Sequence, residues 1–161
     1  MPFPRTEIEA TMVRYLDLRR RIDAGEEQGW TGIADFFTDD CVYIDPAWGR
    51  VQGIAALREF LDESMRGLED WTFPVEYTAI DGDTVVVKWT QISPGTRPDG
   101  SPYCQSGYST LVYAGGGKFA YEEDLLNMAH VNEDLRAAGW RPAAGFVMPP
   151  ANPDRNFSRR S

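Results

Sequence analysis

Apolar residues in the first part of the chain recur with the spacing of amphipathic helices. Thr6 and Glu9 form a capping-box pattern, and the apolar stripe that follows predicts a helix that ends at Gly25. A shorter helix is predicted over residues 30–37 and a third over residues 53–65, each with its apolar side chains on one face. The stripe positions of the first helix are Ile8, Met12, Tyr15, Leu16, Arg19 and Ile22.

The second half of the chain alternates between apolar and polar residues, which is typical of β-strands. Asp81-Gly82 and the glycine-rich segment 114–117 each join two such stretches, so two antiparallel hairpins are expected. Asn127 then caps a last helix that ends near Ala138. The expected strands cover residues 41–45, 71–79, 84–92, 103–113 and 118–126.

This order of elements predicts one α+β domain over residues 1–140, in which the helices pack on one face of a curved antiparallel sheet. Residues 141–161 are rich in proline and are expected to form an extended tail. Long, bent strands leave room between the sheet and the helices. Because sites for small molecules are concave and mostly apolar, this room is the expected binding pocket.

The composition limits the classes of partner and cofactor. The chain has 161 residues, of which 42% are apolar, and its net charge of -9 disfavours nucleic acids and anionic membranes as partners. Cys41 and Cys104 lie far apart and His130 is the only histidine, so neither a disulfide framework nor a zinc site is indicated. The glycine run precedes a strand and not a helix, which argues against a phosphate-binding loop. We expect no cofactor and, without a secretory or membrane-spanning pattern, a cytoplasmic location.

Three segments carry a resemblance to a known family. They are Tyr15-Leu16-Asp17, residues 37–46 (FTDDCVYIDP) and residues 53–60 (GIAALREF). In these segments the chain resembles the nuclear transport factor 2-like superfamily, in particular its SnoaL-like and ketosteroid isomerase-like branches. In the order of its elements, the resemblance covers about residues 6–138. The resemblance implies a cone-shaped domain of the cystatin-like roll type that encloses the pocket, and a homodimer formed through the sheet.

Asp45 is the first candidate catalytic residue. In ketosteroid isomerases the aspartate of a similar Asp-Pro segment is the base that moves a proton, and the resemblance implies this role for Asp45. It likewise implies that Tyr15 donates a hydrogen bond to an oxyanion. A carboxylate in an apolar pocket has a raised pKa and exchanges protons near neutral pH. The sequence leaves two alternatives open: Asp45 as part of a solvent-exposed turn, and Tyr15 as an aromatic core residue.

The second candidate acid lies on the last strand. Ser109 stands where ketosteroid isomerases place an acidic oxyanion donor, which argues against strict ketosteroid isomerase activity. SnoaL-like enzymes place a key acid on the last strands, which implies Asp124, and alternation puts Glu122 on the same face and Glu123 on the other. If Asp45 and Asp124 both face the pocket, repulsion pushes their pKa values apart and gives one acid and one base. A solvated acidic run on an edge strand is the alternative.

We therefore expect a cofactor-independent enzyme that uses general acid/base catalysis on a hydrophobic small molecule, by isomerisation, dehydration or cyclisation, or epoxide opening. The alternative is a non-catalytic domain of the same fold that binds a small molecule or mediates dimerisation. The acidic residues lack the spacing of a known metal-binding loop. His130 is expected to be exposed, with a proton carrier at the pocket mouth as the alternative. The expected catalytic residues are Asp45, Asp124 and Tyr15, and the expected substrate-binding residues are Trp48, Trp89, Tyr108, Ser109, Glu122 and Leu126.

Overall fold

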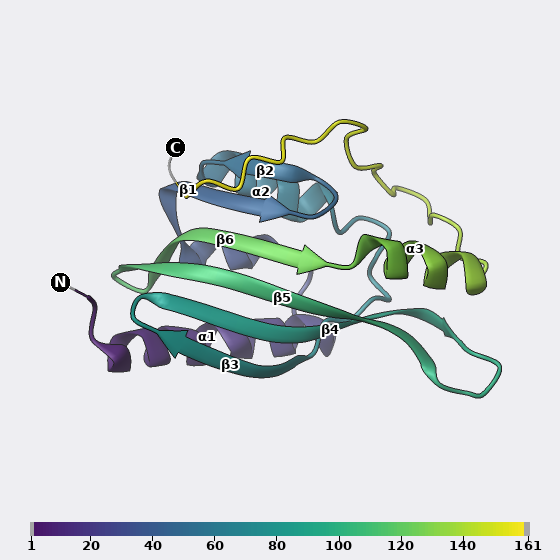
Figure 1. The fold of residues 1–161 in the computed structure, drawn as a ribbon, viewed down its shortest axis with the longest axis horizontal. Coiled ribbons are helices and arrows are strands. Elements are labelled where there is room, and N and C mark those ends of the chain that lie inside the picture. Colours follow the sequence, from purple (N-terminus) through teal and green to yellow (C-terminus); the bar gives the residue numbers. More distant parts are fainter. Residues whose placement is uncertain (1, 160–161) are drawn as a thin grey trace.

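A six-stranded curved sheet forms the framework of the protein in the computed structural model, which describes residues 2–159 (Figure 1). The strands lie in the order β2-β1-β6-β5-β4-β3, and all neighbours are antiparallel except β1 and β6, which run parallel. The strands are β1 (Phe37–Asp45), β2 (Gly49–Gln52), β3 (Val75–Asp81), β4 (Thr84–Thr96), β5 (Pro102–Gly115) and β6 (Lys118–Leu126). The helices are α1 (Arg5–Asp23), the 3-10 helix η1 (Thr31–Phe36), α2 (Ile54–Glu63) and α3 (Met128–Ala137). The predicted α+β class, with N-terminal helices packed on a curved sheet, is confirmed.

Helix α1 begins before the predicted capping box. Pro4 occupies the N-cap position with φ -59° and ψ 130°, and no side chain caps the helix. The Pro4 carbonyl accepts hydrogen bonds from the backbone N–H groups of Glu7 and Ile8, at 3.0 and 3.3 Å. Because proline already holds φ near the helical value, the first turn forms without a side-chain cap. The capping-box prediction for Thr6 is therefore wrong. Of the predicted stripe, Leu16 and Ile22 are half-buried and the other members are buried.

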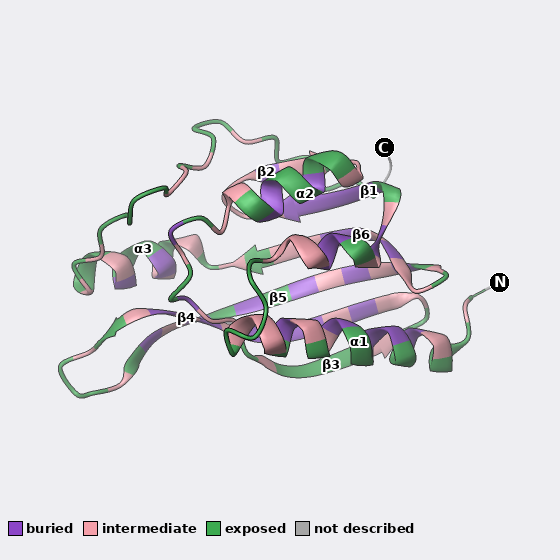
Figure 2. Ribbon diagram, turned by 180° about the vertical axis from the view of Figure 1, so that it is seen from behind, coloured by how far each residue is buried: buried purple, intermediate pink, exposed green. Residues whose placement is uncertain are grey.

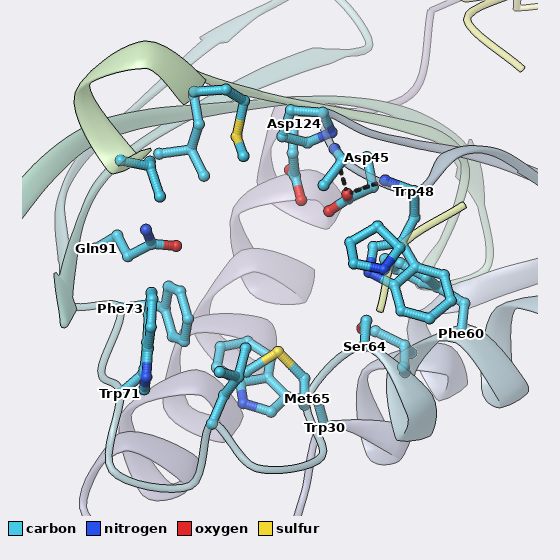
Figure 3. Close-up of a pocket in the computed structure, with 18 of the residues that line it drawn as sticks. Trp30, Asp45, Trp48, Phe60, Ser64, Met65, Trp71, Phe73, Gln91 and Asp124 are labelled. Carbon is cyan, nitrogen blue, oxygen red and sulfur yellow. Dashed lines mark hydrogen bonds between the residues drawn. The ribbon is translucent and has the colours of Figure 1, made fainter. Parts of the chain in front are cut away.

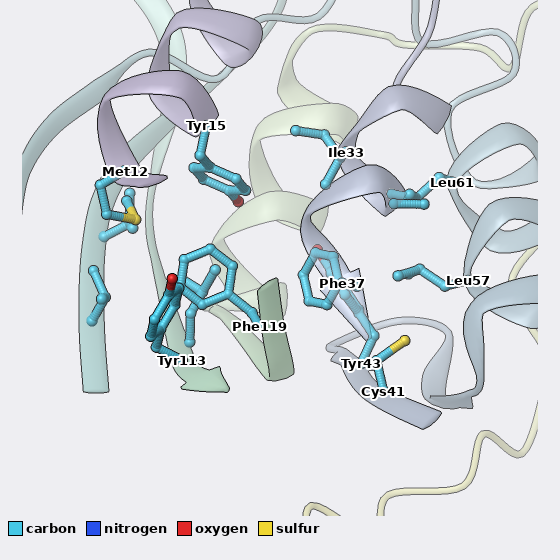
Figure 4. Close-up of a cluster of buried hydrophobic side chains, with 14 of the residues drawn as sticks. Met12, Tyr15, Ile33, Phe37, Cys41, Tyr43, Leu57, Leu61, Tyr113 and Phe119 are labelled. Atoms are coloured by element: carbon cyan, nitrogen blue, oxygen red, sulfur yellow. The ribbon is translucent and has the colours of Figure 1, made fainter. Parts of the chain in front are cut away.

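The core lies between the inner face of the sheet and the helices α1, η1 and α2 (Figure 4). Aromatic rings meet edge to face in it, with centroids 5.5 Å apart for Tyr15 and Phe36 and 5.6 Å apart for Tyr113 and Phe119. Figure 2 shows that the opposite faces of α1 and α2 are largely exposed. The apolar faces predicted from alternation along the strands and from helical periodicity thus pack together in one core. Its fully buried members include Ile8, Ala34, Leu57, Val85, Leu111 and Phe119.

The strands differ from the predicted ones mainly at their ends. β1 begins at Phe37, ahead of the predicted start at Cys41, because Phe37 pairs with Phe119 of β6. The predicted strand over residues 71–79 begins only at Val75. β2 was not predicted, since its 4 residues are too few to show alternation. Only the early start of β1 arises from pairing with a strand that is remote in sequence, whereas β2 pairs with the adjacent strand β1.

The hairpin of β4 and β5 is longer than predicted. Its ladder continues through Ser93, opposite Tyr103, to Thr96, opposite Pro102. The proline and glycine residues at 94 and 95 leave an irregularity in the register at that point. Half of the loop that was expected over residues 93–102 therefore belongs to the two strands, and residues 97–101 connect them. The last helix is confirmed, because the Asn127 side chain accepts a hydrogen bond from the backbone N–H of His130.

The proline-rich tail runs back over the domain to the edge of the sheet (Figure 1). The Arg50 backbone N–H in β2 donates to the Asp154 carbonyl at 2.8 Å, and the Tyr121 hydroxyl donates to the Phe157 carbonyl at 2.8 Å. Gly49 permits this approach, since a Cβ at that position would lie 2.4 Å from the Asp154 oxygen. The tail thus covers the edge strand β2. Residues 160–161, which belong to the predicted tail, lie outside the described residues.

The outer face of the sheet carries exposed side chains, among them Tyr77, Tyr108 and Leu125. A homodimer formed through this face remains a prediction. Among residues 2–159, no helix has both the length and the apolar character needed to cross a membrane.

Candidate functional site

A cavity of about 460 Å³ lies between the inner face of the sheet, the helices and the C-terminal tail (Figure 3). Its walls are mostly apolar, and Asp45 and Asp124 reach it from the same end. An apolar chamber with a few converging polar groups is the usual form of a site for a small molecule. Large aromatic wall residues are Trp30, Trp48, Phe60, Trp71, Phe73 and Trp89.

Asp45 stands at the end of β1, where Pro46 stops the strand. Its Oδ1 accepts hydrogen bonds from the backbone N–H groups of Ala47 and Trp48, at 2.8 and 2.7 Å, so Asp45 does form a turn. Its Oδ2 makes no hydrogen bond with the residues that the structure describes. Burial raises the pKa of Asp45 to about 6, the two backbone hydrogen bonds lower it, and the charge of Asp124 raises it. The side chain reaches solvent only partly, because one side of it forms the cavity wall.

The raised pKa of Asp45 predicts a stability effect that depends on pH. The folded protein binds this proton more tightly than the unfolded chain, whose aspartate has an ordinary pKa of 3.8. Stability is therefore lost as the pH rises from about 4 to about 6. Asp45→Asn keeps an acceptor for both N–H groups and carries no charge. We expect it to be more stable than the wild type by roughly 2 kcal/mol at pH 8 and equally stable at pH 3. Urea unfolding at both pH values measures this, and an equal difference at both would contradict the assignment.

Asp124 is held by hydroxyl groups from two neighbouring strands. The Tyr43 hydroxyl donates to Oδ2 and the Ser109 hydroxyl to Oδ1, each at 2.5 Å. Ser109 in turn accepts a hydrogen bond from the Trp89 indole N–H at 2.9 Å. Burial raises the pKa of Asp124, while the hydrogen bonds from Ser109 and Tyr43 lower it. The cross-strand pairing of Ser109 with Asp124 explains how β5 positions this carboxyl group.

Gly107 makes room for the Trp89 ring. A Cβ at residue 107 would lie 2.4 Å from the Trp89 ring, and the rigid indole would have to move as a whole to relieve such a contact. We expect Gly107→Ala to lower the free energy of unfolding by about 1–3 kcal/mol and to break the hydrogen bond from Trp89 to Ser109. Urea unfolding followed by tryptophan fluorescence measures both effects. Gly32→Ala is the matched control, because its new Cβ would meet only Leu18, at 3.5 Å. Equal stability of the two variants would contradict the prediction.

Glu122 lies on the same face of β6 and is 2% exposed. Burial raises its pKa well above the ordinary value, and the charge of Asp124 raises it further. The Tyr15 hydroxyl donates to Glu122 Oε1 at 3.4 Å, whereas Glu122 Oε2 is buried and has no partner among residues 2–159. Glu122 and Asp124 thus form a pair of neighbouring carboxyl groups whose pKa values are both raised by burial.

Arg19 supplies a buried positive charge next to this pair. Its guanidinium group lies 5.6 Å from the Trp30 ring centroid and 5.8 Å from that of Trp89. Although burial acts to lower its pKa, the charges of Tyr15, Glu122 and Asp124 raise it. The sequence contained a signal for this residue, since Arg19 is the charged member of the apolar stripe of α1.

The structure places most of the predicted site residues at the cavity. Tyr108 is the exception: it is 42% exposed on the outer face of the sheet and does not line the cavity. Successive residues of a strand point to opposite faces, so Tyr108 and Ser109 do not share one site, and the expected role for Tyr108 is corrected. His130 also lies outside the cavity lining, with Nε2 at 3.3 Å from Asp134 Oδ2. The predicted residues that line the cavity are Tyr15, Asp45, Trp48, Trp89, Ser109, Glu122, Asp124 and Leu126.

The sequence interpretation missed the contribution of the tail. Phe146 and Met148 of the tail line the cavity, as does Trp140 just before it, which packs edge to face against Trp71 with centroids 5.8 Å apart. These apolar residues within a proline-rich segment were the only available signal. Gln91 on β4 was missed as well. In the described part of the chain, no group of three or more His, Cys, Asp or Glu side chains is arranged to hold a metal ion.

Comparisons with known proteins identify the fold. The sequence profile of the SnoaL-like domain matches residues 18–121, and no curated protein matches the chain. A protein from Jannaschia sp. CCS1, provisionally named a SnoaL-like polyketide cyclase, superimposes with a TM-score of 0.63 and 19% identity over 85% of this chain and 94% of that one. TerC, co-crystallised with polyporic acid, gives a TM-score of 0.58 and 22% identity over 81% and 98%. SalBIII is an epoxide hydrolase/cyclase-like enzyme of pyran ring formation in salinomycin. It gives a TM-score of 0.56 and 17% identity over 76% of this chain and 92% of that one. These proteins share the fold of the chain.

Proposed function

This chain belongs to the SnoaL-like domain family of the nuclear transport factor 2-like superfamily, and we propose that it is a cofactor-independent enzyme that moves protons on a hydrophobic small molecule. One observation carries the proposal: Asp45 and Asp124, both with raised pKa values, lie in the wall of one apolar cavity. Perturbed carboxyl groups that converge on a cleft are typical of general acid/base sites.

Asp45 is the general base in this proposal. With a pKa of about 6 it is ionised at neutral pH, yet it binds a proton more tightly than an ordinary aspartate. The turn fixes Oδ1, and Oδ2 is left for the ligand. Asp45 Oδ2 removes a proton from an acidic C–H or O–H group of the bound substrate, and the electron pair moves to an adjacent oxygen or carbon atom.

The Asp124–Glu122 pair is the general acid. In this proposal the pair carries the proton, which is favoured because burial raises the pKa values of both carboxyl groups. Asp124 lines the cavity and delivers this proton to the developing oxyanion or to the leaving oxygen, while Glu122 supplies the proton from behind. Tyr15 and Ser109 hold the two carboxyl groups in place through their hydroxyl groups. Isomerisation, dehydration, cyclisation and epoxide opening all use one base and one acid in this way.

The structural neighbours support a small molecule as the substrate. TerC was crystallised with polyporic acid, and SalBIII is named an epoxide hydrolase/cyclase-like enzyme. For this chain, these names favour cyclisation or epoxide opening among the reaction classes above. The alternative of a binding domain without catalysis is favoured by one observation, the turn-forming role of Asp45, which a purely structural aspartate would also fulfil.

A proton-exchange experiment separates an enzyme from a binding domain. The probe is 2-tetralone, a hydrophobic ketone with acidic C–H groups, whose binding is first measured by the fluorescence of the cavity tryptophans. In D2O, the wild type is expected to accelerate the exchange of the C1 protons over buffer, as followed by ¹H NMR. Binding without any acceleration of exchange would favour the non-catalytic alternative.

A further inference from the structure

A hydrogen-bonded chain leads from the cavity wall to the surface and includes none of the residues discussed above as acid or base. Gln91 on β4 lies directly opposite Gln105 on β5, and its Nε2 donates to Gln105 Oε1 at 2.8 Å. Gln105 Nε2 donates to Asp134 Oδ2 at 2.8 Å. Arg97 Nη2 donates to Asp134 Oδ1, also at 2.8 Å. Three of the side chains in this hydrogen-bonded series are buried, with exposed fractions of 6% for Gln91, 2% for Gln105 and 4% for Asp134.

The carboxylate at the end of this chain determines the orientation of both amide groups. Although burial acts to raise it, the pKa of Asp134 is lowered by the hydrogen bonds from Gln105 and Arg97, so Asp134 is ionised and only accepts hydrogen bonds. Gln105 must then turn its NH₂ group to Asp134 and its oxygen to Gln91. Gln91 in turn must give its NH₂ group to that oxygen. The carboxamide oxygen of Gln91 is what remains for the cavity.

Figure 3 shows the result, with the Gln91 oxygen directed into the cavity on the wall opposite Trp48. Among the described residues, nothing donates a hydrogen bond to this oxygen. We propose that Gln91 is a fixed hydrogen-bond acceptor that selects ligands bearing a hydroxyl or N–H group at this point of the cavity. The inference deepens the proposed function and rests on it, because it takes the cavity to be the ligand site.

The predicted substrate is therefore a hydrophobic molecule with a donor group at a distance from the reacting atoms at Asp45 and Asp124. If the ligand places an ether or ketone oxygen at this point, two acceptor oxygens face each other, and no hydrogen bond to Gln91 can form. Such a mismatch leaves a buried acceptor unpaired, which costs about 1–3 kcal/mol. The discrimination comes from an orientation that Asp134 imposes through Gln105, although neither residue lines the cavity.

The test compares two probes, 2-hydroxyanthracene and 2-methoxyanthracene, by fluorescence titration at pH 7. The quantity of interest is the ratio of their Kd values, methoxy over hydroxy, in each protein. The two probes differ in hydrophobicity by the same amount in every experiment, so this difference cancels when the ratios of two proteins are compared. Gln91→Met removes the acceptor and is expected to lower the ratio about tenfold from that of the wild type.

Asp134→Asn is the more specific test of orientation. Arg97 keeps the asparagine oxygen at its own side, so the new NH₂ group faces the Gln105 oxygen, and both glutamine amides turn over. Gln91 then presents a donor to the cavity, and the ratio is again expected to fall about tenfold. His130→Ala is the matched control. It removes an exposed contact with the same carboxylate, leaves the chain intact and is expected to keep the wild-type ratio.

The outcomes separate this inference from the proposed function. A ratio that is unchanged in both Gln91→Met and Asp134→Asn would overturn the Gln91 subsite, even if the proton-exchange activity is present. A fall in the ratio in both variants, with His130→Ala unchanged, supports the subsite even if Asp45→Asn retains activity. If neither probe binds the wild type, both the subsite and the ligand cavity are wrong.

Discussion

Asp45→Asn is expected to reduce the catalysed exchange of 2-tetralone protons by about 10²–10⁴-fold, the usual contribution of a general base. Asparagine still accepts the two backbone hydrogen bonds at Oδ1, so the turn and the cavity persist. What is lost is the negative charge next to the substrate and the capacity to take up a proton. In the wild type, the rate should rise as the pH increases through about 6, because only the ionised carboxylate acts as a base, and it should level off above that pH.

The control for Asp45→Asn is Asp40→Asn, which removes an exposed aspartate from the same strand. It is expected to exchange protons at the wild-type rate. The affinity of Asp45→Asn for 2-tetralone is expected to stay within a few-fold of the wild type, which separates a loss of chemistry from a loss of binding. An unchanged exchange rate in Asp45→Asn would remove this residue from the mechanism.

Asp124→Asn is the second variant with a large expected effect. The substitution places an NH₂ group against the Tyr43 or the Ser109 hydroxyl and removes the cavity-facing member of the acidic pair. Protonation of a leaving oxygen then has no donor. We expect about a 10²–10⁴-fold loss in any reaction that expels an oxygen atom, such as epoxide opening, with a smaller loss in simple proton exchange.

An epoxide probe measures this difference. We compare the rates of styrene oxide hydrolysis by the wild type, Asp124→Asn and Glu123→Gln. Glu123→Gln is the control, because Glu123 lies on the other face of β6. Glu123→Gln is expected to match the wild type. Equal rates for Asp124→Asn and Glu123→Gln would contradict the assignment of Asp124 as the acid.

The sequence was sufficient for the fold class because its two periodicities are unambiguous. The stripe of α1 and the alternation in β4, β5 and β6 each identify the face that is buried. The ends of elements were harder to predict. Pro4 replaced the predicted cap at Thr6, and β2 exists only because it pairs with β1. Both features are local but too short to leave a periodic pattern of apolar residues in the sequence.

The candidate site was likewise predictable from the sequence only in part. Alternation predicted that Glu122 and Asp124 share a face, but which face points inward depends on the register with β5, where Ser109 pairs with Asp124. Tyr108 was assigned to the cavity because aromatic character alone does not reveal orientation. The role of Gln91 depends on Gln105 and Asp134, which three separate elements bring together. No local pattern marks such a chain.

The pKa of Asp45 provides the most direct test, because it requires no substrate. Labelling with ¹³C at the aspartate carboxyl groups, with the Asp45 signal assigned by its absence from Asp45→Asn, allows NMR titration in the wild type and in Asp124→Asn. We predict a pKa of about 6 in the wild type and a lower pKa in Asp124→Asn, because the charge of Asp124 contributes to the increase. A wild-type pKa near the ordinary 3.8, unaffected by Asp124→Asn, would contradict a coupled pair of carboxyl groups in an apolar cavity.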